Sequence, residues 1–553
     1  MDAIDVGRED LAAWVAAQPK NFFSEDPLIP ALLTRLLASE DRAAMLRRLE
    51  DFGALCAGPM DEAATVNNRN ENLPRLERYD RIGRRTEGVE HHPSYHDVGR
   101  MIYESGMMSE YGRPGGFLRS LAFFLLSSHC GEAGHNCPVA CTAGIIKSLQ
   151  GLGSEDLRAT YLPRLLSPRY AERFDGAQFL TEVQGGSDVG ANATRAEPAV
   201  DGTWRVFGEK WFCSNADADL FLMTARWSEE RDGTSGLGLF LVPRRLSDGS
   251  TNAFHIRRLK DKLGTRSMPS GEIDFAGAVA WALGEPSEGF KNMMRFVINV
   301  SRIYNGVAVT GTARRAWHVA RTYAAHRRAF GRPIGEYALV QDNLADLEAF
   351  SAETLLGSFL LVPMLDDAEA GALSADEQAF LRMGTNLHKR RSAMTATACV
   401  LQGIEVLGGN GAIESFSILP RLLRDAIVCE NWEGTHHTLT AQVLRDMARY
   451  RLHEPFLRVL EQRLGCLSCP ATAAERALLA SSVRHAHDAL DGLREDAGTH
   501  DAPLRLKPWM DTLAWQLAGL AFLEQAEHTQ GQPAGQALLP VLRHYFQRRF
   551  PTA

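Results

Sequence analysis

A single acidic residue late in the chain has the surroundings of a general base. Glu433 lies between a large aromatic residue, Trp432, and the pair Gly434-Thr435. Contact with an indole removes water from a carboxylate, which favours the neutral form and tunes the group for proton transfer near neutral pH. Gly434 allows a close backbone approach to a ligand, and Thr435 adds a hydroxyl. The alternative is a helix end with an exposed glutamate, and these four residues alone do not decide between the two.

A glycine-rich loop at residues 179–189 is the second candidate for chemistry. Gly185 and Gly186 permit a tight turn whose N–H groups can face the anionic parts of a cofactor. Thr181 and Ser187 place hydroxyls on either side of that turn. An ordinary surface turn is the alternative reading. Hydrolase chemistry is not expected, because Val189 stands where a nucleophile elbow needs its last glycine.

The N-terminal elements that must position these residues are helical. Residues 31–37 carry leucines on one helical face, and Pro30 suits the first turn of that helix, where its missing N–H costs nothing. The polar segment 60–87 is expected to be a surface loop. We assign residues 1–177 to an N-terminal helical domain.

The period of the apolar residues changes to two over residues 178–284. Strands are expected at 204–207, 220–223, 237–242 and 272–275, separated by turn pairs such as Asp201-Gly202 and Asp248-Gly249. The pattern predicts a middle antiparallel β domain.

Helical periodicity returns at Glu288. Apolar and small residues recur every three or four positions from 309 to 324, and further helices are expected at 351–363, 375–408 and 417–430. We assign residues 285–452 to a helical bundle and residues 453–553 to an extra C-terminal helical domain. The fold class is therefore α+β, with several domains.

Composition excludes several function classes. A formal net charge of −8 gives no global reason to expect a nucleic-acid or anionic-membrane partner. The nine cysteines lack framework spacing, which indicates a reducing compartment. The acidic N-terminus does not resemble a secretory signal, and no apolar run is long enough to span a bilayer. We expect a cytoplasmic protein without a membrane partner.

Five segments, in the right order and spacing, resemble the acyl-CoA dehydrogenase family between about residues 90 and 450. They are Leu180-Thr181-Glu182 with Gly186-Ser187-Asp188; Gly208 to Asn215; Arg327-Arg328-Ala329-Phe330-Gly331 with Gln341; Leu407-Gly408-Gly409-Asn410-Gly411; and Trp432-Glu433-Gly434-Thr435. Each motif alone is weak, whereas five in order are specific. The AidB-type branch, known for alkylation-response flavoproteins, is the closer resemblance, because of residues 184–189, 210–212 and 259–264, the Trp before Glu433 and the extra C-terminal domain.

The resemblance implies a catalytic role for one residue. Glu433 matches the base that removes the α-proton of an acyl-CoA thioester while the β-hydrogen leaves as hydride to flavin N5. The thioester oxygen must be polarised for this, which the family does with a backbone N–H at the base and a flavin ribityl hydroxyl. The resemblance also implies substrate contacts at Ser187, Arg302 and Gly434. It implies no metal.

The resemblance further implies that FAD is the cofactor and lies between the β layer and the late helices. The positions matching the family's flavin contacts are Leu180, Thr181, Gly186, Ser187, Phe212, Ser214, Arg327, Phe330, Gln341, Gly408, Gly409, Gly411, Thr435 and His437. Several of these bind FAD across a subunit interface in the family, which implies a homo-oligomer, a dimer or a tetramer. Electron-transfer flavoprotein or another acceptor would reoxidise the flavin.

Departures from the family pattern leave alternatives open. Phe212 replaces a Trp, Ala412 stands where a Tyr is usual, and His436-His437 replaces a common Ser-Gln. These departures are compatible with the implied flavin pocket and bear on the implied acyl-CoA channel, so three hypotheses stay open. The first hypothesis is an FAD-dependent acyl-CoA dehydrogenase. The second is an AidB-like, DNA-binding flavoprotein of alkylation defence with little dehydrogenase turnover, and the third is an oligomeric scaffold with a structural flavin.

Three smaller signals favour structural roles. The histidines at 91, 92 and 96 have no positioned acidic or thiol partner in the sequence, and Pro93 interrupts them. The CxxC pair Cys466 and Cys469 has no second pair to complete a zinc site. In the C-terminal domain, arginines including Arg543, Arg548 and Arg549 are nearly balanced by acidic residues, which argues for weak DNA binding at most.

Overall fold

The computed structural model describes residues 7–551, and these residues divide into two compact units. Unit 1 comprises the segments up to residue 59, 114–131 and 305 onward. Unit 2 comprises residues 60–113 and 132–304. The four-part division expected from periodicity stays a prediction, because the units are assembled from discontinuous segments.

A seven-stranded sheet forms the centre of unit 2. Its strands are β3 (Gly176–Phe179), β4 (Arg195–Pro198), β5 (Trp204–Ser214), β6 (Leu220–Arg226), β7 (Leu237–Pro243), β8 (Phe254–Leu259) and β9 (Ser270–Ala282). They are ordered β3-β6-β4-β5-β9-β7, with β8 on β9 and a further β6–β7 pairing. All four strands expected from the sequence are present. The pairing is mostly antiparallel as expected, but β6 runs parallel to β3 and to β4.

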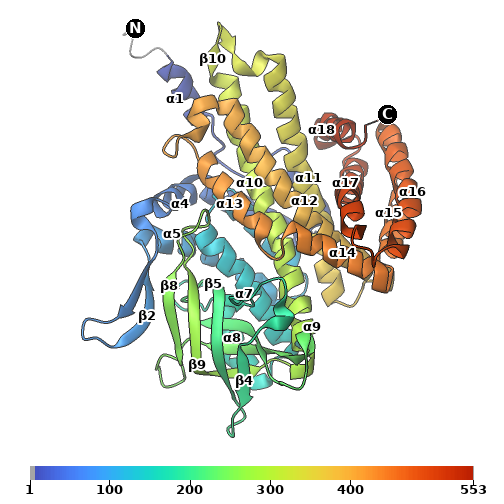
Figure 1. Ribbon diagram of the computed structural model, residues 1–553. Coiled ribbons are helices and arrows are strands. Elements are labelled where there is room, and N and C mark those ends of the chain that lie inside the picture. The colour runs from blue at the N-terminus through green and yellow to red at the C-terminus, as the bar shows by residue number, and fades with distance from the viewer. Residues whose placement is uncertain (1–6, 552–553) are drawn as a thin grey trace. The chain divides into compact units, whose positions relative to one another are not determined.

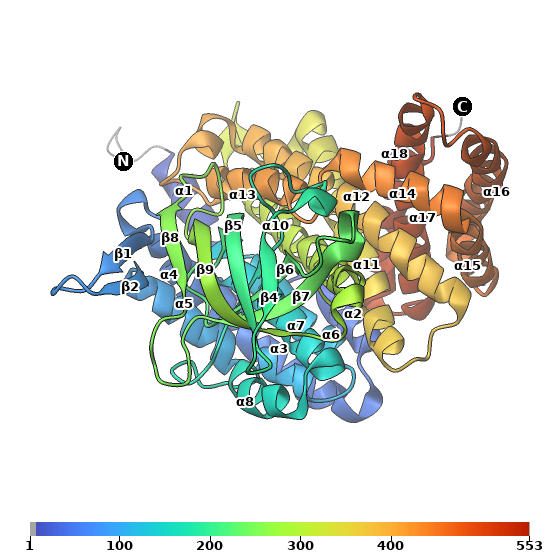
Figure 2. The same cartoon turned by 60° about the horizontal axis from the view of Figure 1, so that its bottom comes forward.

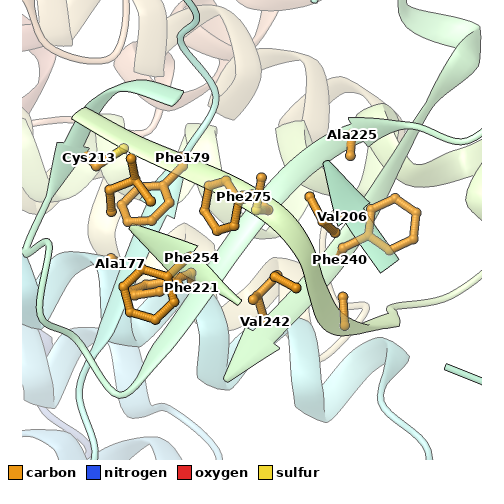
Figure 3. Close-up of a cluster of buried hydrophobic side chains, with 14 of the residues drawn as sticks. Ala177, Phe179, Val206, Cys213, Phe221, Ala225, Phe240, Val242, Phe254 and Phe275 are labelled. Atoms are coloured by element: carbon orange, nitrogen blue, oxygen red, sulfur yellow. The ribbon is translucent and has the colours of Figure 1, made fainter. Parts of the chain in front are cut away.

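The sheet is held together by a buried apolar cluster. Phe179, Phe221, Phe254 and Phe275 pack against one another and against small residues such as Ala177 (Figure 3). Phe221 and Phe254 meet edge to face, with ring centroids 5.3 Å apart. Aromatic pairs of this kind add stability beyond the apolar area that they bury.

Helices complete unit 2. They are α4 (Asp61–Asn67), α5 (Pro93–Glu104), α7 (Ala133–Leu152), α8 (Glu155–Leu165) and α9 (Gly289–Met293), with the start of α10 (Asn299–His326). The expectation of a surface loop at 60–87 is wrong. That segment contains α4 and most of an antiparallel hairpin of β1 (Arg75–Tyr79) and β2 (Arg85–Glu90). The alternation was missed because the hairpin has a single apolar cross-strand pair, Leu76 opposite Val89, so no apolar period of two appears in the sequence.

Long helices dominate unit 1. They are α1 (Arg8–Ala16), α2 (Ile29–Leu36), α3 (Ser39–Leu55), α6 (Gly116–Ser128), most of α10, α11 (Ala338–Glu369), α12 (Ala375–Leu407), α13 (Leu419–Asn431), α14 (His436–Tyr450), α15 (His453–Gly465), α16 (Ala473–Glu495), α17 (Ala502–His528) and α18 (Pro533–Arg549). A short hairpin of β10 (Arg328–Ala329) and β11 (Arg332–Pro333) follows α10. Helices α15 to α18, coloured orange to red in Figure 1, pack side by side as the expected C-terminal helices.

The small residues of α10 are buried where helices approach closely. Ala313, Ala316, Trp317, Ala320 and Ala324 belong to one core cluster with residues of α12 and α13. Helix α11 is long and apolar enough to cross a membrane by length and composition, but 89% of its apolar window is buried inside the structure. We therefore interpret α11 as a core helix of the bundle.

Candidate active site

The loop after β3 in unit 2 is fixed by a buried ion pair. Lys210 Nζ lies 2.6 Å from Glu182 Oε1, and the two side chains are 0% and 2% exposed. Glu182 Oε2 also accepts from the Ala193 N–H at 2.6 Å, and Lys210 donates to the Leu180 carbonyl. Burial by itself would raise the pKa of Glu182, but Lys210 and the Ala193 N–H hold it below its ordinary value. The pair anchors both ends of the glycine turn to β5.

The glycine turn itself is tight. Glu182 and Gly185 exchange two backbone hydrogen bonds, and the Trp211 N–H donates to the Thr181 carbonyl at 2.9 Å. A Cβ on Gly186 would lie only 2.8 Å from Thr181 Oγ1, so a side chain there would push the threonine aside. Ser187 is exposed on the same turn.

Strand β5 presents an aromatic ring and a hydroxyl close to this loop. Phe212 is 53% exposed, an unusual position for a large apolar side chain. Ser214, two residues further, is half-buried and lies 3.4 Å from the Ser270 hydroxyl. Lys260 lies over the rings of Trp211 and Phe212, with its Nζ 3.4 and 4.9 Å from their centroids. An open aromatic face next to the half-buried hydroxyls of Thr181 and Ser214 fits a planar ring with polar edges, as the isoalloxazine of FAD has.

In unit 1, Glu433 lies in the turn between α13 and α14. Its φ is 57°, in the left-handed region that a glutamate rarely adopts, and Gly434 follows with φ 108°. Thr435 caps α14 by accepting from the Thr438 N–H, and the Glu433 side chain is half-buried. Glu433 therefore lies just after the C-terminal end of α13, but it has a strained backbone conformation and is half-buried rather than exposed.

A buried lysine holds this turn. Lys389, on α12, donates to the Glu430 and Gly434 carbonyls at 2.9 Å each and is fully buried. Close by, Glu430 accepts from Thr397 and His436, and the His436 hydrogen bond holds the pKa of Glu430 below its ordinary value. Sequence reasoning missed Lys389, because it stands in the basic run 388–391, which reads as a solvated face.

The glycine turn after α12 has two positions that require glycine. Gly408 has φ 61° and ψ −142°, a conformation essentially closed to other residues, and a Cβ on Gly411 would lie 2.7 Å from the Ile404 carbonyl oxygen. Gly409 is open, with nothing within 4 Å of an added Cβ.

The Arg327 segment forms an exposed tip. Phe330 and Gly331 connect β10 and β11 with φ 49° and 88°, and Phe330 is 97% exposed. Gln341 is exposed on α11, and Arg327 is half-buried beside this hairpin.

The remaining predicted positions are placed as follows. Arg302 is buried on α10, 3.4 Å from Asn299 Oδ1 in unit 2, and His437 is exposed in the first turn of α14. Within each unit, predicted site residues that are close in the sequence lie in the same loop or turn. Their roles in binding and catalysis stay predictions.

The minor signals have structural explanations. His91 pairs with Asp217 at 3.2 Å, His92 caps α5, and His96 meets the Tyr170 hydroxyl. Cys466 and Cys469 are free thiols, the first exposed and the second buried.

Comparison with known families identifies the class of protein. The AidB N-terminal domain matches residues 15–172, the acyl-CoA dehydrogenase middle domain residues 177–278, and the acyl-CoA dehydrogenase C-terminal domain residues 287–448. The chain belongs to the acyl-CoA dehydrogenase family, a family of flavoproteins whose cofactor is FAD.

Individual relatives refine this to the AidB type. The chain is 32% identical over 462 residues to acyl-CoA dehydrogenase family member 11 of Caenorhabditis elegans, covering 80% of this chain and 74% of that protein. It is 34% identical over 389 residues to the putative acyl-CoA dehydrogenase AidB of Escherichia coli K12, covering 68% and 69%. The crystal structure of Caenorhabditis elegans ACDH-11 in complex with C11-CoA matches with a TM-score of 0.83 at 28% identity, covering 96% of this chain and 92% of that one.

Proposed function

We propose that this chain oxidises an acyl-CoA thioester to the α,β-enoyl thioester, with Glu433 as the base. The observation that carries the proposal is the turn itself: its backbone is strained at Glu433 and pinned on both sides by Lys389. The complex of the nematode relative with C11-CoA supports a fatty acyl-CoA as the substrate class.

In this proposal the chain's residues divide the work. The Glu433 carboxylate takes the α-proton, and the backbone N–H groups of the turn polarise the thioester oxygen. Bound FAD would supply the acceptor for the β-hydrogen, which leaves the substrate as hydride. The cofactor is bound by Thr181, Ser187, Phe212, Ser214 and the Gly408–Gly411 turn. The substrate is contacted by Arg302 and Gly434.

The test is anaerobic mixing of the yellow holoprotein with a panel of straight-chain acyl-CoAs, followed by flavin absorbance. Wild-type flavin should bleach with at least one thioester, and Glu433→Gln should bleach about 10²–10⁴ times more slowly because the base is gone. Glu414→Gln is the matched control, since Glu414 is an exposed glutamate paired with Arg424. Bleaching of Glu433→Gln at the wild-type rate would place the base elsewhere.

Failure of every thioester to bleach wild-type flavin would favour the AidB-like alternative. In that alternative the C-terminal helices would bind duplex DNA. The arginines singled out there already have acidic partners: Arg548 binds Asp342 and Asp346, Arg549 binds Glu353, and Arg543 lies 3.9 Å from Glu475. A duplex gel shift that falls steeply with salt would support DNA binding, and no shift at low salt would exclude it.

A further inference from the structure

The β1–β2 hairpin projects from the rest of unit 2 and ends in a rigid turn (Figure 2). Asp80 Oδ1 accepts from the N–H groups of Ile82 and Arg84 at 2.9 and 2.8 Å, and Gly83 supplies φ 81°. We name residues 78–84 the hairpin tip. Because its backbone is held by Asp80, the tip presents its side chains in a fixed arrangement.

Two large apolar side chains of the hairpin tip face solvent. Tyr79 is 52% exposed and Ile82, at the apex, is 64% exposed. Two exposed large apolar residues within four positions at the end of a projecting element indicate a surface that a membrane or another molecule covers.

The hairpin tip is also locally cationic on an acidic chain: residues 78–84 carry three arginines and one aspartate, whereas the whole hairpin, residues 75–90, carries five arginines and four acidic residues. Arg75, Arg78, Arg81 and Arg84 are exposed, and among the described residues none of the four has a salt bridge. By contrast, Arg85 pairs with Glu87. The single carboxylate of the hairpin tip, Asp80, is occupied by backbone N–H groups. Outside the tip, Glu77 on β1 and Glu90 on β2 are exposed, and Glu90 lies opposite Arg75 in the strand pairing. The chain as a whole carries −8, so the positive surface here is local.

We propose that the hairpin tip docks on an anionic phospholipid surface, with Ile82 and Tyr79 entering the bilayer interface and the arginines binding phosphate headgroups. Two attractive interactions hold peripheral proteins on charged membranes: burial of apolar side chains in the interface and electrostatic attraction between basic residues and anionic lipids. The hairpin tip offers both, with apolar side chains at the apex and arginines around it. The proposed docking is peripheral. The negative net charge of the whole chain gives no indication of this local positive surface.

The shape of the hairpin tip decides between a bilayer and a protein partner. A stable protein interface involves about 20–30 residues from each partner, whereas the hairpin tip consists of residues 78–84 alone. A bilayer needs only a few inserted side chains and several charges. A shallow depression of about 490 Å³ beside the tip is lined by Leu76, Glu77, Arg78, Tyr79, Arg258 and Leu259, so apolar, basic and acidic side chains meet there.

The test is co-sedimentation of the full-length holoprotein with vesicles of phosphatidylcholine mixed with phosphatidylglycerol, against phosphatidylcholine alone. Binding should occur only to the anionic vesicles and should fall with salt. The double variant Arg81→Gln/Arg84→Gln should bind about 25-fold more weakly, about fivefold per arginine, which corresponds to about 1 kcal/mol for each basic residue near the surface. Ile82→Ser should bind about tenfold more weakly.

Matched controls lie in the same unit. Arg169→Gln/Arg195→Gln removes two exposed arginines that pair with Glu172 and Glu197, and Val200→Ser removes another fully exposed apolar residue. Neither should change vesicle binding by more than twofold. Equal losses in the controls, or no binding to anionic vesicles at low salt, would overturn the proposal. A shift of duplex DNA that needs the arginines but not Ile82, without vesicle binding, would assign the surface to nucleic acid. A change in solution mass on Ile82→Ser would assign it to a second copy of the chain.

Discussion

Lys389 shows how a single residue can set the geometry of the proposed base. Its ammonium group donates to backbone carbonyls on both sides of Glu433, and a fully buried cation of this kind is costly unless such partners are present. Lys389 projects from helix α12, but its hydrogen bonds go to the turn that contains Glu433, so the turn accounts for a buried lysine at this position. We therefore assign Lys389 a positioning role toward Glu433.

Lys389→Met should destabilise the chain and slow the proton abstraction. Two buried carbonyls lose their charged donor, at a cost of about 1–3 kcal/mol. Urea unfolding should show that loss, and single-turnover flavin bleaching should slow while thioester binding, measured by titration, changes little. Unchanged bleaching in a correctly folded Lys389→Met protein would separate the lysine from the base.

At the scale of elements, the turn from α12 to α13 contains two neighbouring glycines with different backbone requirements, so substitution of one is a control for substitution of the other. Gly408 needs its glycine for backbone reasons, whereas Gly409 has neither a positive φ nor a close neighbour. Gly408→Ala should cost about 1–3 kcal/mol, and Gly409→Ala should stay within about 0.5 kcal/mol. Thermal unfolding of the two variants measures the difference, and equal stability would contradict the strained conformation at Gly408.

The bundle helices of unit 1 should lose stability as the pH falls. Burial lowers the pKa of His388, which packs against Gly306 and Gly357 and bonds to Ser358, to about 4. In the unfolded chain the His388 imidazole takes up a proton near pH 6.5, whereas in the folded chain it stays neutral until about pH 4. Stability is therefore complete above pH 6.5 and declines as the pH drops from 6.5 to 4, by up to about 3 kcal/mol for this group.

Urea midpoints across this range measure the effect. Burial lowers the pKa of His318 to about 4 in the same way, so the decline should be steeper than one group accounts for. His388→Gln should flatten it in part. A midpoint independent of pH between 6.5 and 4 would contradict the buried, neutral histidines.

At the scale of the whole molecule, the exposed apolar residues of unit 1 argue for self-association. Phe330 is 97% exposed and Leu339 is 87% exposed, nine positions apart along the segment from β10 to the start of α11. Residues of this segment resemble the family's flavin contacts across a subunit interface, so we propose that a second copy covers them.

Phe330→Asp should then dissociate the oligomer and weaken FAD retention. A buried, unpaired carboxylate at the interface has no compensating partner, so association becomes unfavourable. Sedimentation analysis and the flavin absorbance after gel filtration measure the two effects. Arg332→Gln, in the same hairpin, is the control, because Arg332 lies over Tyr337 within its own subunit. A monomeric wild-type protein that keeps its FAD would contradict the interface.

The sequence by itself determined the layers of this protein. Strands β5, β6, β7 and β9 and helices α11, α12 and α13 fall where periodicity and turn residues predict them, because a half-buried strand or helix must repeat its apolar residues with its own period. The family followed from five short motifs, of which Gly208 to Asn215 lies almost entirely on strand β5 and the other four lie in turns between elements or directly beside them.

The tertiary structure alone decided three other features. The hairpin of β1 and β2 has only one apolar cross-strand pair, Leu76 opposite Val89, so its pairing left no periodic trace in the sequence. The partnership of Glu182 with Lys210 joins residues 28 positions apart, and local sequence does not specify which cation neutralises a buried carboxylate. The burial of Lys389 depends on two carbonyls presented by a distant turn. Local periodicity reports which face of an element is apolar, but long-range polar pairing depends on where the chain brings those faces together.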